Sequence, residues 1–346
     1  MDKVTKAVRD VIIGERRAPG FSLAYSMGGE VVYRGWDGNQ VFNTPQHDKP
    51  YAEDTILELA SVTKTIVAAL IFRLRDEGKL NIEDKVKKHA PEIYFDDVTI
   101  YHMLTHSSGG YDDCEMSPNR EDFLRRVHWD STRAGLKDCI ARMYAYDRRW
   151  YPIGTKSIYS AGYLILQDLI ERLSGMPVED YARKVLFEPL GMADTHFDER
   201  LVDAKRFIMK NDYDRETGED KLFLDAINTP AVGNAGVFST VDDMMKFTLM
   251  FLNGGAQVLE AKTVVEMVTE CPEFHRTPAF QMDPAVFGSG ASLTAVGHPG
   301  SSGTCIVIDM DKKHTSALLS NNGVNMPGDV HGRCFDIVRD SFEKNS

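Results

Sequence analysis

The chain has 346 residues, of which 42% are hydrophobic and 27% are charged, and its formal net charge is −12 at pH 7. This composition is typical of a globular protein with a large core, and the acidic balance argues against a nucleic-acid partner, which requires a basic face. No apolar run is long enough to cross a bilayer, so we expect no membrane partner either.

The N-terminal region predicts one helix followed by a β-hairpin. Residues 2–15 alternate apolar and charged positions at helical spacing. The segment FSLAYSM-GG-EVVYRGW then has two β-rich runs around Gly28-Gly29, a pair of residues typical of a tight hairpin turn.

The middle of the chain is mainly helical. Apolar residues recur at helical spacing between breaks formed by Pro and Gly. The predicted helices cover 61–78, 100–106, 121–128, 135–146, 162–174 and 178–187. Residues 198–232 are polar and irregular, which predicts a surface excursion whose acidic run is a solvated loop.

Strand patterns return in the C-terminal part. The segment STVDDMMKFTLMFLNGG predicts a helix with a Ser/Thr cap and a Gly-Gly end. Strands follow in GASLTAVGH, TCIVIDM and TSALLSN, and a last helix covers 329–343. We therefore expect an α/β protein of the α+β type, whose antiparallel sheet is built from both chain ends and flanked by helices. The sheet domain would comprise 1–60 and 233–346, the mainly helical region 61–232, with the active site at their junction.

The segment LELASVTKTIVAALIFRL places a charged residue beside a wholly apolar run. Ser61 and Lys64 are three residues apart, hence neighbours on one helix face. The helix N-terminus and apolar surroundings both lower the pKa of a lysine, which would let Lys64 act as a base for the Ser61 hydroxyl. The N–H groups of the helix start could also stabilise an oxyanion.

A purely structural interpretation of this segment stays open at this point. Ser61 could cap the helix, and Lys64 could extend its ammonium to solvent. The S-x-x-K pattern also occurs by chance in chains of this size, and a second copy spans Ser341 to Lys344, where no apolar helix follows.

Several longer segments bear on the choice between these interpretations. They are PGFSLAYSMGGEVVYRGW, the S-x-x-K helix itself, VTIYHMLTHSSGG, PIGTKSIYSAGYLILQDLIERLSGMPVEDY, VLFEPLGMADTHF, NAGVFSTVDDMMKFTLMFLNGG and GHPGSSGTCIVIDM. In this order the chain resembles the serine β-lactamase and penicillin-binding protein superfamily, and most of all its class C branch with related esterases and D-amino-acid peptidases. The resemblance covers nearly the whole chain and implies a β-lactamase/transpeptidase-like fold.

The resemblance also implies roles for individual residues. Ser61 matches the nucleophile, Lys64 its partner base, and Tyr159 the tyrosine that protonates the leaving group and helps to activate water. His298 and Gly300 match the K/H-x-G strand that lines the substrate site, where His298 would act as a donor or an electrostatic aid and Gly300 would let the substrate approach the backbone closely. The oxyanion hole would consist of the backbone N–H groups of Ser61 and Ser301.

Two positions depart from the family pattern. Ala161 stands where the tyrosine motif has an asparagine that holds the lysine and a substrate amide carbonyl, and this segment is one residue short. Pro299 replaces a hydroxyl residue and removes an N–H from the strand, so recognition of a substrate carboxylate should suffer. Both departures favour esters or unusual amides over penicillins.

Other chemistries lack their motifs. His102 and His106 have a zinc-compatible spacing but lack the glutamate of H-E-x-x-H and a third ligand, so we expect no metal. The chain contains no G-x-S-x-G and no Walker or dinucleotide-binding glycine pattern, so we expect neither an α/β-hydrolase nor a cofactor.

Compartment, substrate and alternatives complete the expectations. The start is charged and unlike a secretory signal, and the five cysteines (114, 139, 271, 305 and 334) contain no C-x-x-C, so we expect a cytoplasmic protein with unpaired thiols. We expect a serine hydrolase acting on a small molecule, with specificity in loops 111–150 and 198–232. A catalytically silent binding protein and an acyltransferase remain as alternatives, and the sequence predicts no oligomeric state.

Overall fold

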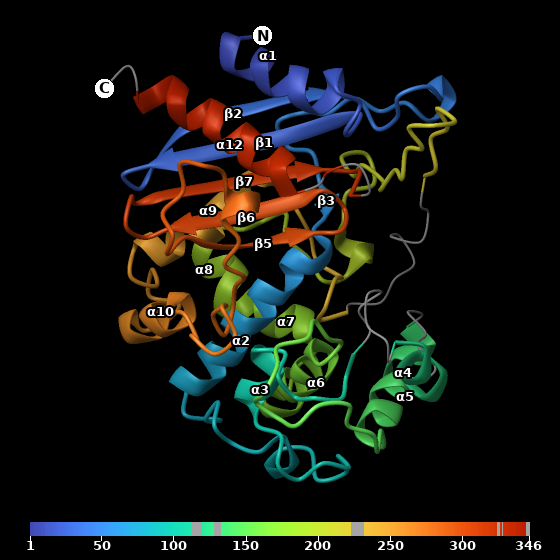
Figure 1. Cartoon of the computed structure of the whole chain (residues 1–346), viewed down its shortest axis with the longest axis vertical. Coiled ribbons are helices and arrows are strands. Elements are labelled where there is room, and N and C mark those ends of the chain that lie inside the picture. The colour runs from blue at the N-terminus through green and yellow to red at the C-terminus, as the bar shows by residue number, and fades with distance from the viewer. Residues whose placement is uncertain (113–119, 128–132, 223–231, 324–325, 327, 344–346) are drawn as a thin grey trace.

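A five-stranded antiparallel sheet forms the upper half of the molecule (Figure 1). The structure is a computed structural model, and it describes residues 1–112, 120–127, 133–222, 232–323, 326 and 328–343. The strands are β1 (Gly20–Met27), β2 (Glu30–Gly38), β5 (Val296–Gly300), β6 (Thr304–Asp309) and β7 (His314–Ser320), in the order β2-β1-β7-β6-β5. Because β1 pairs with β7, strands from both chain ends form one sheet, which confirms the predicted fold class.

The N-terminal hairpin forms where the sequence predicts it. Gly28 and Gly29 have φ values of 61° and 87°, a left-handed backbone that glycine adopts without steric cost. Two such residues suit the tight turn that matches the twist of antiparallel strands, and Met27 therefore pairs with Glu30 across it.

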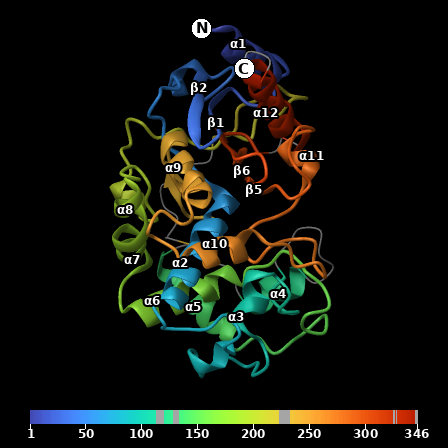
Figure 2. The ribbon, with the colours of Figure 1, turned by 90° about the vertical axis from the view of Figure 1, so that its left-hand side faces the viewer.

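Helices cover both faces of the sheet (Figures 1 and 2). On one face lie α1 (Lys3–Arg9), which continues as a π-helical turn over Asp10–Gly14, α11 (Pro284–Phe287) and α12 (Gly328–Glu343). On α12, Val330, Cys334 and Val338 recur every four residues and are fully buried against this layer. The other face is covered by α9 (Val241–Leu252), whose N-cap Thr240 accepts a hydrogen bond from the Asp243 N–H.

The lower half consists mainly of helices, and α2 (Thr63–Asp76) extends into it from below the sheet (Figure 1). Every residue of α2 from Ile66 to Phe72 is at most 1% exposed, because α6 and its neighbours surround it. The others are α3 (Ile100–Leu104), α4 (Arg120–Val127), α5 (Arg133–Tyr144), α6 (Tyr163–Ser174), α7 (Val178–Ala182), α8 (Glu188–Leu190) and α10 (Ala261–Val268). A two-stranded ladder of β3 (Leu57–Glu58) and β4 (Phe238–Ser239) lies just before α2. None of the helices among the described residues has the length and apolar character needed to span a membrane.

One predicted strand is too long at its N-terminal end. GASLTAVGH predicts a strand from residue 290, but β5 begins at Val296. The preceding residues form turns in which the Ser292 N–H donates to Asp309 and the Ala295 N–H donates to the Ser292 carbonyl. Those two N–H groups therefore already have hydrogen-bond acceptors and are not available to pair with a neighbouring strand.

Candidate active site

Ser61 lies in a tight turn at the start of α2. The turn is a 3-10 helix over Ala60–Val62, and Ala60 has a φ of 47°, an unfavourable backbone conformation for a residue with a Cβ. The β3–β4 ladder and the hydrogen bond from the Leu59 N–H to the Val237 carbonyl hold this turn. Ser61 is partly exposed, and no side chain caps α2, so the interpretation of Ser61 as a helix cap is wrong.

Lys64 is buried beneath Ser61. Lys64 is 3% exposed, and its Nζ lies 3.3 Å from Ser61 Oγ. The same Nζ donates a hydrogen bond of 2.7 Å to the backbone carbonyl of Asn234. Lys64 therefore does not extend to solvent, and the arrangement of hydroxyl and amine is the one that nucleophilic catalysis requires.

The carbonyl that binds Lys64 is held by two helices. The Gly233 N–H donates to Gln167 Oε1 on α6 at 2.6 Å, and the Val237 N–H donates to Thr63 Oγ1 on α2 at 3.0 Å. Ala161 is buried and has no polar side chain with which to bind Lys64. The backbone carbonyl of Asn234 accepts the hydrogen bond from the lysine instead.

Tyr159 adjoins the Ser61–Lys64 pair from a non-helical segment before α6. Lys64 Nζ lies 4.5 Å from the centre of the Tyr159 ring, within the range of a cation–π contact. The ring stacks on His106 with a centroid distance of 4.8 Å and lies 6.0 Å from the ring of His298. The fold thus brings together Ser61, Lys64, Tyr159 and His298, which are up to 237 positions apart in the sequence.

Strand β5 packs directly on the turn that holds Ser61. A Cβ at Gly300 would lie 2.4 Å from the Leu59 carbonyl oxygen and 2.2 Å from Thr304 Oγ1, so only glycine allows this approach. Thr304 Oγ1 and Ser302 Oγ donate to the carbonyls of Leu59 and Glu58. Gly300 therefore serves the packing of the strand on the Ser61 turn, a reason for glycine that is separate from the expected approach of substrate. Ser301 follows it and is exposed.

His298 lies at the site but does not act as a cation there. It is 1% exposed, its Nε2 lies 3.5 Å from Gln281 Nε2, and burial lowers its pKa to about 3, with Lys64 nearby as a smaller cause. The imidazole is therefore neutral at physiological pH, which favours the expected role of donor over that of an electrostatic aid.

Buried neutral histidines make the protein sensitive to mild acid. Burial lowers the pKa of His298 to about 3 and that of His331 to about 4, from 6.5. Below pH 6.5 the unfolded chain binds protons that these folded side chains do not, so the free energy of unfolding falls as pH decreases. We expect each to remove about 2 kcal/mol between pH 7 and pH 5. Urea unfolding at both pH values measures this loss.

Two substitutions separate this effect from general acid sensitivity. In His331→Gln the loss between pH 7 and pH 5 should be smaller by about 2 kcal/mol. The matched variant His47→Gln changes an exposed histidine and should leave the loss as in wild type. An equal loss in all three proteins would contradict the prediction.

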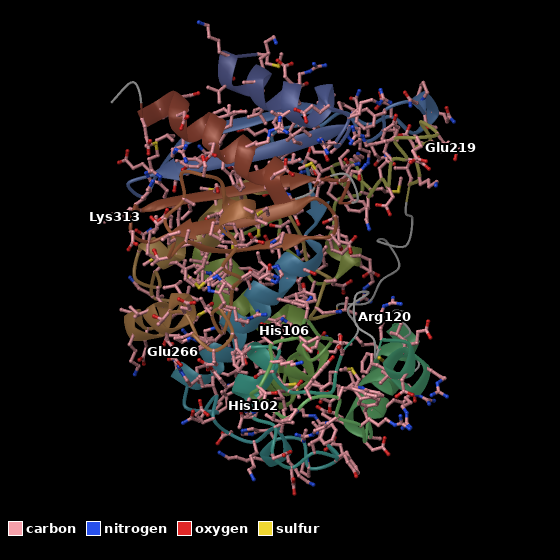
Figure 3. All side chains as sticks on the ribbon, in the orientation of Figure 1. His102, His106, Arg120, Glu219, Glu266 and Lys313 are labelled. Carbon is pink, nitrogen blue, oxygen red and sulfur yellow. The ribbon has the colours of Figure 1, made fainter. Side chains whose placement is uncertain are left out.

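The histidines of HMLTH serve different partners (Figure 3). His102 forms a capping box with Thr99 at the start of α3. His106 is buried nearer the sheet, and its Nδ1 accepts a hydrogen bond from the Ser160 N–H at 3.0 Å. Within the described ranges, no group of three or more His, Cys, Asp or Glu residues could hold a metal ion.

Three residues at the site were not identified from the sequence. Asn234 binds Lys64 through its backbone, which leaves no signal in the residue type. His106 stacks on Tyr159, but the sequence drew attention to it only through its spacing to His102, which suits zinc. Arg276 carries no motif at all, yet it interacts electrostatically with Tyr159.

Comparisons with known proteins are consistent with this geometry. A sequence profile for the family described as Beta-lactamase matches residues 2–333. The Escherichia coli (strain K12) protein named "Putative D-alanyl-D-alanine carboxypeptidase" is 26% identical over 349 residues, which cover 88% of this chain and 78% of that protein. Esterase EstB of Burkholderia gladioli is 32% identical over 200 residues, 55% of this chain and 50% of the esterase. The octameric penicillin-binding protein homologue from Pyrococcus abyssi superposes with a TM-score of 0.77 at 25% identity, covering 98% of this chain and 78% of that structure.

Proposed function

This chain belongs to the β-lactamase family, and we propose that it is a serine hydrolase that forms a covalent acyl-enzyme on Ser61. The observation that carries the proposal is the 3.3 Å distance between the partly exposed Ser61 Oγ and the buried Lys64 Nζ. A hydroxyl with an amine base at this distance has the geometry of an activated nucleophile. The names of the relatives, a carboxypeptidase and an esterase, support a hydrolytic reaction.

The proposed reaction has two steps. Ser61 Oγ attacks the acyl carbon while its proton passes to Lys64 or Tyr159, and the carbonyl electron pair moves to the oxygen. The N–H groups of Ser61 and Ser301 stabilise that oxyanion. As the intermediate collapses, the bond to the leaving group breaks, and Tyr159 returns the proton to it. Water then attacks the acyl carbon of the ester on Ser61 and gives a proton to the same groups. The bond between the acyl carbon and Ser61 Oγ breaks, Ser61 takes that proton back, and the acid leaves.

We propose an ester or an unusual amide as the substrate. Pro299 pairs with Cys305 at the edge of the sheet and has neither an N–H nor a hydroxyl with which to bind a substrate carboxylate. Position 161 offers no side-chain amide for a substrate carbonyl. Classical penicillins depend on a carboxylate contact and an amide contact, so these two residues favour substrates that need neither contact.

The proposal is tested by comparing three substrates on the purified protein. A short-chain nitrophenyl ester, a chromogenic cephalosporin and a D-alanyl-D-alanine peptide would be assayed at pH 7. We expect the highest kcat/KM for the ester, with a burst of nitrophenol when deacylation limits the rate. The cephalosporin or peptide as the best substrate would overturn the ester assignment. No turnover of any of them would favour the binding-protein alternative, and a product that appears only with an added alcohol would identify an acyltransferase.

A further inference from the structure

The side chain of Arg276 is a buried cation within electrostatic range of Tyr159, and it has no acidic partner among the residues that the structure describes. We propose that Arg276 stabilises the deprotonated form of Tyr159, and so acts as a positioning residue for proton transfer in the proposed hydrolase. This inference rests on the proposed function and adds a residue to it that no motif identifies.

A short extension of the sheet places Arg276 beside the site. Gln281 pairs with Gly297 on β5, with hydrogen bonds of 2.8 and 3.0 Å between their backbones. Arg276 pairs with Gln281 in turn, and Cys271 pairs with Arg276. Two successive β-bridges thus connect Arg276 to the strand that carries His298. Arg276 is within electrostatic range of the phenols of Tyr159 and Tyr163.

Arg276 is enclosed and lacks a counter-charge among the residues that the structure describes. The residue is 7% exposed, its Nη2 has no hydrogen-bond partner there, and its Nε donates to the Thr277 carbonyl at 3.3 Å. No carboxylate forms an ion pair with it in those parts of the chain. A guanidinium stays protonated even when buried, so it costs stability unless a nearby group becomes negative.

The histidines and the second tyrosine around Tyr159 carry no positive charge. Burial keeps the pKa of His106 well below its usual value, as it does that of His298, so both rings are neutral. Burial also raises the pKa of Tyr163, whose hydroxyl donates to the Leu104 carbonyl. Lys64 and Arg276 are therefore the two cations among these groups that interact with Tyr159, and the Tyr159 ring lies nearer to Lys64 Nζ than the Tyr163 ring does, at 4.5 Å against 5.9 Å.

Lys64 and Arg276 therefore have different roles in the proposed reaction. Lys64 contacts both Ser61 and the Tyr159 ring, whereas Arg276 belongs to the backbone extension beyond β5. A phenolate held by Arg276 can take the Ser61 proton as the Oγ–carbon bond forms, which yields a neutral phenol. When the leaving group departs, that proton moves to it and the phenolate forms again. His298 is neutral and cannot provide this charge.

The test compares Arg276→Met with wild type through two pH titrations. The first measures the rate constant for the reaction of Ser61 with a fluorophosphonate, in which Oγ binds phosphorus and fluoride leaves, as a stand-in for acylation between pH 5 and pH 10. We expect its midpoint to rise by about 1 pH unit or more in Arg276→Met, with acylation about tenfold slower below the midpoint. The second follows the near-ultraviolet absorbance of tyrosinate, with Tyr159→Phe subtracted to isolate Tyr159. The midpoint of Tyr159 should rise by the same amount, and Arg276→Lys should restore much of both shifts.

A stability measurement separates this role from a structural one. Removing a buried charge that lacks a partner should leave the melting temperature of Arg276→Met unchanged or higher. The matched variant Arg339→Met removes an arginine that is similarly buried but paired with Asp336 and Asp340 on α12. We expect it to lower the melting temperature and leave both titrations unchanged.

Two results would overturn the inference. Unchanged midpoints in Arg276→Met would mean that Arg276 does not act on Tyr159, and a large drop in melting temperature would mean that it pairs structurally. Failure of the proposed function is recognised separately, because then wild type would form no adduct on Ser61. The tyrosinate titration would still test Arg276 in that case.

Discussion

Replacing Ser61 with alanine is expected to abolish covalent labelling and hydrolysis. Wild type should gain the mass of one fluorophosphonate adduct, and Ser61→Ala should gain none when intact protein is measured. Removal of the nucleophile should lower kcat/KM by on the order of 10⁴-fold or more, because the base and the oxyanion donors then have no attacking group to assist.

The second S-x-x-K copy provides the matched control. Ser341 lies on α12 at the outer face of the sheet, and its Oγ donates to the Ile337 carbonyl. Ser341→Ala should label and react as wild type does. An adduct that persists in Ser61→Ala would place the nucleophile elsewhere. A folded wild type that never labels would count against a serine hydrolase and for a binding protein.

Replacing Lys64 with methionine is expected to slow acylation while leaving the fold intact. Methionine fills a similar volume in the buried position but cannot exchange a proton, so the rate constant for acylation should fall by about 10²- to 10⁴-fold. The hydrogen bond to the Asn234 carbonyl is lost. The hydrogen bonds that Gln167 and Thr63 accept from the backbone on either side of Asn234 remain. Stopped-flow acylation with an activated ester measures the effect.

Two further measurements make this prediction specific. Thermal unfolding of Lys64→Met should stay close to wild type, because a buried ammonium is replaced by an apolar side chain. Lys246→Met is a control, since this lysine on α9 is exposed and pairs with Asp243. Acylation of Lys64→Met within a few-fold of wild type would assign proton transfer from Ser61 to other groups.

Much of the fold was predictable because it depends on local patterns. The glycine pair at 28–29 and the capped helix over Val241–Leu252 follow from preferences of a few neighbouring residues. The strand predicted at 290–295 was wrong because a local pattern does not show which partners the backbone finds in the folded protein. Those residues have a strand-like pattern, but hydrogen bonds to Asp309 and within the turn satisfy their backbone instead.

The candidate site was predictable only in part. Ser61, Lys64 and Tyr159 belong to motifs, and the structure brings them together, but their roles await the experiments above. The choice between a donor and an electrostatic aid at His298 was not predictable, because burial sets its pKa and the sequence does not reveal how deep a strand residue lies.

The sequence by itself determined most of the elements and which side chains are candidates for the chemistry, because periodicity, turn residues and the S-x-x-K spacing are local properties. The tertiary structure alone decided three things. It placed the Asn234 carbonyl on Lys64, pressed Gly300 against the Leu59 carbonyl, and left Arg276 enclosed beside Tyr159 without a carboxylate among the described residues. Each joins residues far apart in the chain, and burial and electrostatic range depend on distance in space.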